Sequence, residues 1–215
     1  MAFRNLLQKF KYHYKKYFAV FFAVLAALCA FGDFVTTLVS LVQSTNAPNI
    51  MTFWNILFYL YAIYLFYLLY RGNKENSPAS FQAVLMFTWS LLFYQIFTFI
   101  FDLLFNSPLN LLAFLEREEY LSFSFLISSY VILLAEIVIG IFGYIRLKQY
   151  MSGQYVSSAK IKALFTIFFS MVILGSVPAV YLLILLNTNI FTILFYSYAS
   201  FGAIASIFTI LRLSD

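Results

Sequence analysis

Six long apolar runs constrain the fold of this chain more than any other feature of its sequence. They cover residues 18–42, 51–70, 81–105, 121–145, 163–186 and 190–211. A helix of 20 or more residues crosses the roughly 30 Å of hydrocarbon in a bilayer. The 215 residues are 64% hydrophobic and only 10% charged, too few polar residues to cover a water-soluble domain of this length. The sequence therefore predicts an all-α polytopic membrane protein in which six transmembrane helices form a single membrane domain.

The basic residues indicate how these spans are oriented. Twelve of the 13 Lys and Arg lie in the N-terminal segment, the loop between the second and third spans, the loop between the fourth and fifth spans, or the C-terminal tail. Only Arg117 lies on the other side. Because basic residues are retained in the cytoplasm, both termini are expected to be cytoplasmic. An even number of spans agrees with this, and we expect a multi-pass protein of the cell membrane.

Residues 1–17 form a separate basic segment before the first span. Apolar residues such as Phe3, Leu6 and Phe10 recur at helical spacing, and most Lys and Arg side chains lie elsewhere on the helix. This pattern predicts an amphipathic juxtamembrane helix that lies on the anionic cytoplasmic leaflet. The alternative is a docking surface for a partner membrane subunit. The apolar run that follows is too long for a cleaved signal peptide, so we expect a retained signal-anchor.

The first span carries a line of small and polar residues along one face, while its other residues are mainly Phe, Val and Leu. The line repeats every 3.5 residues, the spacing of a left-handed helix pair. Small residues in lipid mark where a neighbouring backbone comes close. We therefore expect this face to be buried against other helices. Its members are Ala19, Ala23, Ala26, Ala30, Asp33, Thr37 and Ser40.

Three other spans carry comparable lines, which should also face the interior of the bundle. The third has Thr88, Gln95 and Asp102 seven residues apart. The fourth has Ser122, Ser129, Glu136 and Gly143 at the same spacing, and the sixth has Ala199, Gly202, Ser206 and Thr209.

A candidate ligand site follows from the depth of the polar residues in the membrane. At a rise of about 1.5 Å per residue, Asp33 lies roughly 22 Å above the cytoplasmic end of its span. Four residues of other spans fall near the same level, which predicts an outward-facing polar pocket around Asp33. Glu136 lies lower, roughly 13 Å up, and Asp102 lies at the outer interface, so these two are candidates for a proton or polar relay. The four residues at the level of Asp33 are Asn55, Gln95, Ser129 and Tyr196.

The intramembrane acids have few ways to be stabilised. An ionised acid in hydrocarbon costs at least about 2.5–3.5 kcal/mol, and no Lys, Arg or His lies in any predicted span. Asp33 must be protonated, hydrated, bound to a cation, or paired with another chain, and desolvation favours its neutral form. The purely structural interpretation is a clasp, with Asp33 bonded to Gln95 or a tyrosine and Glu136 bonded to Ser129 or a tyrosine. A third interpretation is lateral contact with a partner subunit.

Several classes of function find no support in the sequence. The single Cys29 and the single His13 provide neither a disulfide framework nor a His-based metal site. The chain has no Ser-His-Asp set, no HExxH and no Gly-x-Ser-x-Gly. Its basic residues flank the spans and do not form a folded basic face. We therefore expect a protein that is not an enzyme, binds no nucleic acid, and needs no metal or other cofactor.

The remaining function classes are binding and docking. Hypothesis one is a small integral membrane binding or transport subunit with its pocket around Asp33. Hypothesis two is a non-catalytic accessory or immunity-type membrane protein that docks another membrane protein. In size, span number and orientation the chain is similar to substrate-binding membrane subunits of vitamin importers and to bacteriocin immunity proteins, but no motif ties it to either family.

Overall fold

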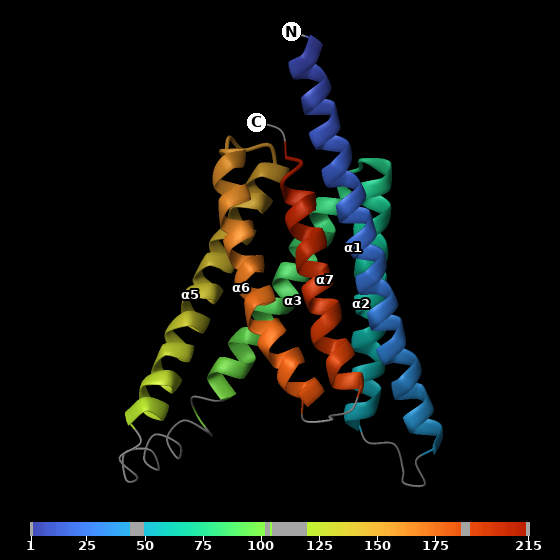
Figure 1. Ribbon diagram of the computed structural model, residues 1–215, viewed down its shortest axis with the longest axis vertical. Helices are drawn as coiled ribbons and strands as arrows, with labels where there is room; N and C mark the ends of the chain where they lie inside the picture. The colour runs from blue at the N-terminus through green and yellow to red at the C-terminus, as the bar shows by residue number, and fades with distance from the viewer. Residues whose placement is uncertain (1, 44–49, 102–103, 105–119, 186–189, 214–215) are drawn as a thin grey trace.

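A computed structural model of the chain describes residues 2–43, 50–101, 104, 120–185 and 190–213, and these residues form helices without a β-strand (Figure 1). This confirms the all-α prediction. The helices are α1 (Ala2–Gln43), α2 (Ile50–Glu75), α3 (Ala79–Phe101), α5 (Tyr120–Met151), α6 (Ser158–Leu185) and α7 (Ile190–Ile210). Short described turns lie between α2 and α3 and between α5 and α6.

Four of these helices are long and apolar enough to cross a membrane within the described residues. They are Tyr12–Gln43 of α1, Ala79–Phe101 of α3, Ile127–Met151 of α5 and Ser158–Ser176 of α6. The described apolar part of α7, Ser197–Ile210, is shorter. A helical bundle with membrane-spanning helices is therefore supported, whereas the prediction of six spans with cytoplasmic termini stays a prediction.

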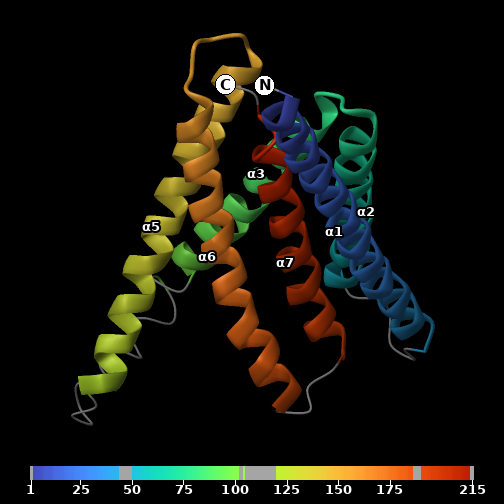
Figure 2. The same cartoon turned by 45° about the horizontal axis from the view of Figure 1, so that its top comes forward.

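The helices are arranged as a closed ring of which α7 is a member. Going round the ring, α1 packs against α2, α2 against α3, α3 against α5, α5 against α6, α6 against α7, and α7 against α1. Helix α7 also touches α2 and α3. Both views show the helices gathered at the end that holds the two termini and diverging toward the opposite end (Figures 1 and 2).

The line of small and polar residues on α1 is buried as predicted from Ala19 to Asp33, but beyond Asp33 the prediction is wrong, because Thr37 is only half-buried and Ser40 is exposed. Its four alanines are 0% exposed and Asp33 is 1% exposed. The opposite face of the helix carries exposed Phe21, Leu28 and Phe31. Within the described residues α1 contacts only α2 and α7, so the alanines allow these two backbones to come close.

Glycines provide close contacts elsewhere in the bundle. A Cβ placed at Gly140 of α5 would lie 2.6 Å from the Phe168 ring of α6, and one at Gly202 of α7 would lie 2.6 Å from the Phe66 ring of α2. Glu136 is buried on the same face of α5 as Gly140, but Ser129 is exposed. The predicted interior line of α5 is therefore correct at Glu136 and wrong at Ser129, where α5 has diverged from the bundle (Figure 1).

A tight turn joins α2 to α3. Asn76 adopts the left-handed conformation with φ 56°, and the Ser77 amide donates to the Gly72 carbonyl at 2.9 Å. This is the Schellman arrangement that ends many helices. Pro78 then immediately precedes Ala79, the first residue of α3, and its missing N–H costs nothing there because no intrahelical partner exists for a donor at that position. A Cβ at Gly72 would lie 2.3 Å from the Ser80 backbone nitrogen, so the turn requires glycine there.

A polar cluster fastens the two ends of the chain to α2. Arg212 donates to the Asn73 and Asn76 side-chain oxygens, at 2.5 and 2.7 Å, and to the Tyr12 hydroxyl at 2.9 Å. Asn73 is fully buried and donates to Thr209 of α7 at 2.9 Å. These bonds connect α1, α2 and α7 where the helices converge. Nearby, the hydrogen bond and charge of Glu75 raise the pKa of the exposed Arg71 guanidinium.

Replacing Gly72 by Ala should lower the stability of the protein by about 1–3 kcal/mol, because the added methyl group meets backbone atoms that cannot rotate away. The matched control is Gly175→Ala in α6, where an added Cβ meets nothing within 4 Å. The control should leave stability unchanged or slightly higher. Thermal unfolding of the purified protein in detergent compares the two, and equal melting temperatures would contradict the close approach of α2 and α3.

Replacing Asn73 by Ala should lower the free energy of unfolding by about 1–3 kcal/mol, because it removes the hydrogen bonds that the buried Asn73 side chain makes with Arg212 and Thr209. Arg71→Ala on the same helix removes an ion pair whose side chains are 57% and 51% exposed, and should change stability little. Thermal unfolding measures both variants. Similar losses for the two would show that the Arg212 cluster does not fasten the termini.

Candidate functional site

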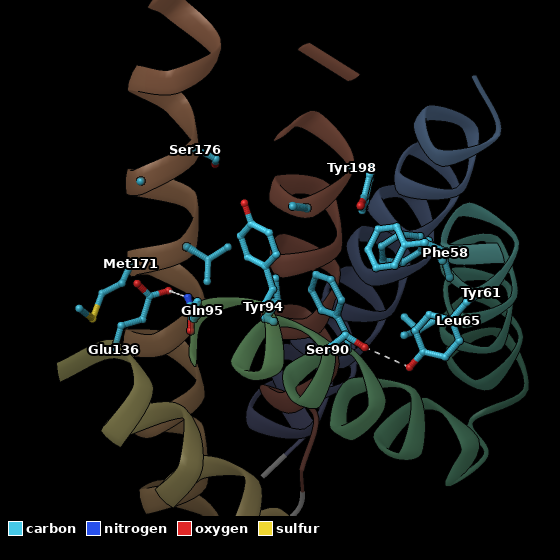
Figure 3. Close-up of a pocket in the computed structure, with 17 residues that line it drawn as sticks. Phe58, Tyr61, Leu65, Ser90, Tyr94, Gln95, Glu136, Met171, Ser176 and Tyr198 are labelled. Atoms are coloured by element: carbon cyan, nitrogen blue, oxygen red, sulfur yellow. Dashed lines mark hydrogen bonds between the residues drawn. The ribbon is translucent and has the colours of Figure 1, made fainter. Parts of the chain in front are cut away.

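A partly enclosed cavity of about 220 Å³ lies near the middle of the bundle (Figure 3). Helices α2, α3, α5, α6 and α7 line it, and α1 does not. Its walls are mainly apolar or aromatic, formed by Phe58, Tyr61, Ala62, Leu65, Phe66, Phe87, Leu91, Tyr94, Met171, Val172, Gly175, Tyr198 and Ala199. The other lining residues are polar: Ser90, Gln95, Glu136 and Ser176.

Two of these polar residues, Gln95 of α3 and Glu136 of α5, are hydrogen-bonded to each other. The Gln95 amide nitrogen donates to the Glu136 carboxylate at 2.5 Å. Glu136 is 8% exposed, and the Gln95 amide oxygen is buried without a hydrogen-bond partner among the described residues. This side of the cavity therefore holds a carboxylate oxygen and an amide oxygen, both of which accept hydrogen bonds.

The other hydroxyl groups of the cavity wall are bonded within the protein. The hydroxyls of Tyr61 and Ser90 lie 3.1 Å apart, and those of Ser176 and Ser200 lie 2.5 Å apart. Ser90 also donates to the Met86 carbonyl. Figure 3 shows the Tyr61–Ser90 pair and the Gln95–Glu136 pair at opposite sides of the cavity. The site is thus apolar in the middle, with its unpaired acceptor beside Glu136.

Three lining residues are also exposed on the surface of the protein. Phe58 is 42% exposed and Tyr94 is 53% exposed, and Gly175 is exposed with open space where a side chain would begin. These three come from α2, α3 and α6. They mark where a small molecule could enter.

Asp33 lies outside this cavity, in the contact between α1, α2 and α7. Both of its carboxylate oxygens are buried and have no hydrogen-bond partner among the described residues. Tyr59 of α2 and Tyr198 of α7 lie within electrostatic range of the carboxyl. Tyr198 is itself a lining residue, so it lies between the cavity side of α7 and the Asp33 side.

The structure therefore places only some of the predicted site residues at the cavity. Gln95, from the predicted pocket, and Glu136, from the predicted relay, meet in the cavity, whereas Asp33 and Asn55 do not line it. Ser129 also lies elsewhere and is exposed, as is Asn55. The Tyr196 side chain and Asp102 fall outside the described residues.

Both predicted structural clasps were assigned the wrong partners. Gln95 bonds Glu136, not Asp33, and Glu136 bonds Gln95, not Ser129 or a tyrosine. The physical reason is the order of the helices in the ring. Gln95 belongs to α3, which packs against α5, whereas α1 contacts only α2 and α7 within the described residues. Equal depth in the membrane does not make two residues neighbours.

Sequence reasoning missed most of the lining residues. Tyr61 and Ser90 belong to different predicted spans, and no spacing in the sequence links them. Ser176 carries no signal of its own, because serines bond helix carbonyls in many membrane helices. Gly175 is a single glycine within an apolar run, which by itself does not indicate a cavity. Within the described residues no three His, Cys, Asp or Glu side chains gather as metal ligands.

Comparisons of the chain with models of protein families, with curated proteins and with solved structures found no match. The site is therefore interpreted from its own geometry.

Replacing Asp33 by the isosteric Asn should leave stability equal to or higher than that of the unchanged protein, because it removes an ionisable group that has no described partner. Gln95→Leu should instead lower stability by about 1–3 kcal/mol, because it removes the donor to a buried carboxyl. Thermal unfolding in detergent tests both. A large loss on Asp33→Asn would reveal that the carboxyl has a specific structural partner.

Proposed function

We propose that this chain is a small integral membrane binding subunit, of the kind a transport system uses, and that its ligand is a small amphipathic molecule held in the cavity beside Gln95 and Glu136. The cavity is the single observation that carries the proposal. It replaces the pocket that the sequence predicted around Asp33.

The proposed setting is the cell membrane, with six spans and both termini in the cytoplasm. Twelve of the 13 Lys and Arg lie on the side of the termini. Exposed Tyr12, Tyr14 and Tyr17 lie at the same end of α1, as expected for a helix at an anionic membrane surface. In this orientation the helices converge at the cytoplasmic side and diverge toward the outside.

The size of the cavity limits the ligand. An apolar cavity of about 150 Å³ holds a benzene molecule. At about 220 Å³, this cavity has room for one ring with a short side chain. Its lining of aromatic and aliphatic side chains with a few polar groups is typical of small-molecule sites. A ligand with an apolar ring and one polar end matches this lining.

The polar side of the cavity supports the binding of a ligand, as opposed to a purely structural role for Gln95 and Glu136. The Gln95 amide oxygen is buried without a described partner, and such a group costs about 1–3 kcal/mol unless a bond is made. A ligand that donates a hydrogen bond to this oxygen would remove that cost. The docking function of hypothesis two rests on sequence features alone, and the experiment below separates it from binding.

The cavity should bind small molecules that contain a single ring. A larger side chain at position 175 should reduce this binding. We expect radiolabelled 2-phenylethylamine, 2-phenylethanol or both to bind the protein in lipid nanodiscs, as measured by equilibrium dialysis. Gly175→Leu places a side chain into open space at the cavity wall and should reduce binding at least about tenfold, equivalent to about 1.4 kcal/mol.

Gly175→Ala is the control, because it adds a single methyl group and should keep most of the binding. Empty nanodiscs correct for probe that dissolves in the lipid. Binding that is absent, or that the Leu variant does not reduce, would contradict the proposal and favour a docking function.

A further inference from the structure

We infer that the ligand of this cavity is an organic cation, a protonated amine attached to a single apolar ring, bound with its ammonium group between the Glu136 carboxylate and the Gln95 amide oxygen. This inference rests on the proposed function and names its ligand class. Three observations carry it: the charge of the cavity wall, the geometry of the acceptors, and the aromatic walls.

Among the described residues, the wall of the cavity holds an acidic group and no basic one. Glu136 and Asp33 are both buried, and no Lys, Arg or His lies in any of the six apolar runs. A buried carboxylate needs an opposite charge or a proton to be stable. Glu136 lines the cavity, so a cation can reach it from outside the protein, whereas Asp33 does not line it. Glu136 is therefore the acid that a ligand can neutralise.

The acceptors beside Glu136 call for a ligand with several donors. The Gln95 amide nitrogen already donates to the carboxylate, which leaves the Gln95 amide oxygen unpaired in the same wall. Two neighbouring acceptors match an ammonium group, which has three donors and no acceptor. A hydroxyl group has one donor and would leave one acceptor unpaired. A carboxylate ligand would face like charge and has no donor to offer.

The rest of the cavity suits the apolar part of such a ligand. Ser90 and Gln95 are five residues apart on α3, a rise of about 7.5 Å. That length accommodates a ring and a two-carbon chain that ends in an amine. The Phe66 and Phe87 rings, with centroids 5.5 Å apart, and the Tyr94 ring provide aromatic surface for the ring and for the cation. The Tyr61 and Ser90 hydroxyls bond each other, so no ligand donor is needed there.

The experiment compares three probes of nearly the same shape in nanodiscs at neutral pH. They are 2-phenylethylamine, which is cationic, 2-phenylethanol, which is neutral, and phenylacetate, which is anionic. We expect the amine to bind the unchanged protein about tenfold or more tighter than the alcohol, since hydrogen bonds to charged groups are stronger than neutral ones. Phenylacetate should not bind measurably.

Glu136→Gln tests which residue produces the preference. The new amide keeps the shape of the side chain and can still accept the Gln95 hydrogen bond, but it has no charge. The amine affinity should fall about tenfold or more, to the level of the alcohol. The alcohol affinity should fall less than the amine affinity, and the retained alcohol binding shows that the variant is folded.

The outcomes separate the two proposals. If both probes bind equally and Gly175→Leu blocks both, the binding function holds and the cation inference is wrong. A preference for the amine that survives in Glu136→Gln also overturns the inference. If no probe binds the unchanged protein, both proposals fail.

Discussion

The hydrogen bond between Gln95 and Glu136 is the interaction on which this account depends. It joins α3 to α5, two helices long and apolar enough to cross a membrane, and it holds a carboxyl group at the wall of a cavity. A group of this kind is expensive to bury, so its position in the interior needs a physical reason. The hydrogen bond from the Gln95 amide stabilises the buried Glu136 carboxyl in part. In our proposal, the positive charge of a bound ligand provides the remaining stabilisation.

Close contacts between helices surround the cavity without filling it. Alanines along α1 allow α2 and α7 to approach, and Gly140 and Gly202 admit the rings of Phe168 and Phe66. The Arg212 cluster then ties α1, α2 and α7 together where the helices converge. Gly175 differs from these glycines, because nothing fills the space beside it. The same residue type thus makes a tight contact at one place and part of a cavity wall at another.

The sequence predicts the helices and their buried faces better than it predicts which residues meet. The alanine line of α1 was correct because a 3.5-residue repeat is a local property of one helix. The burial of Glu136 and Gly202 followed for the same reason. The pairing of Asp33 with Gln95 was wrong because it depends on the order of helices in the ring, which depth in the membrane does not specify. The cavity depends on the shapes of five helices together, and no local pattern encodes that.

The most direct test measures how close a bound amine lies to the Glu136 carboxyl. Solid-state NMR can detect this by dephasing of carboxyl-labelled ¹³C glutamate by the ¹⁵N nucleus of bound 2-phenylethylamine. We predict that one glutamate carboxyl signal is dephased, and that the effect disappears in Glu136→Gln. A bound amine that dephases no glutamate carboxyl, or that still dephases one after this substitution, would contradict the account.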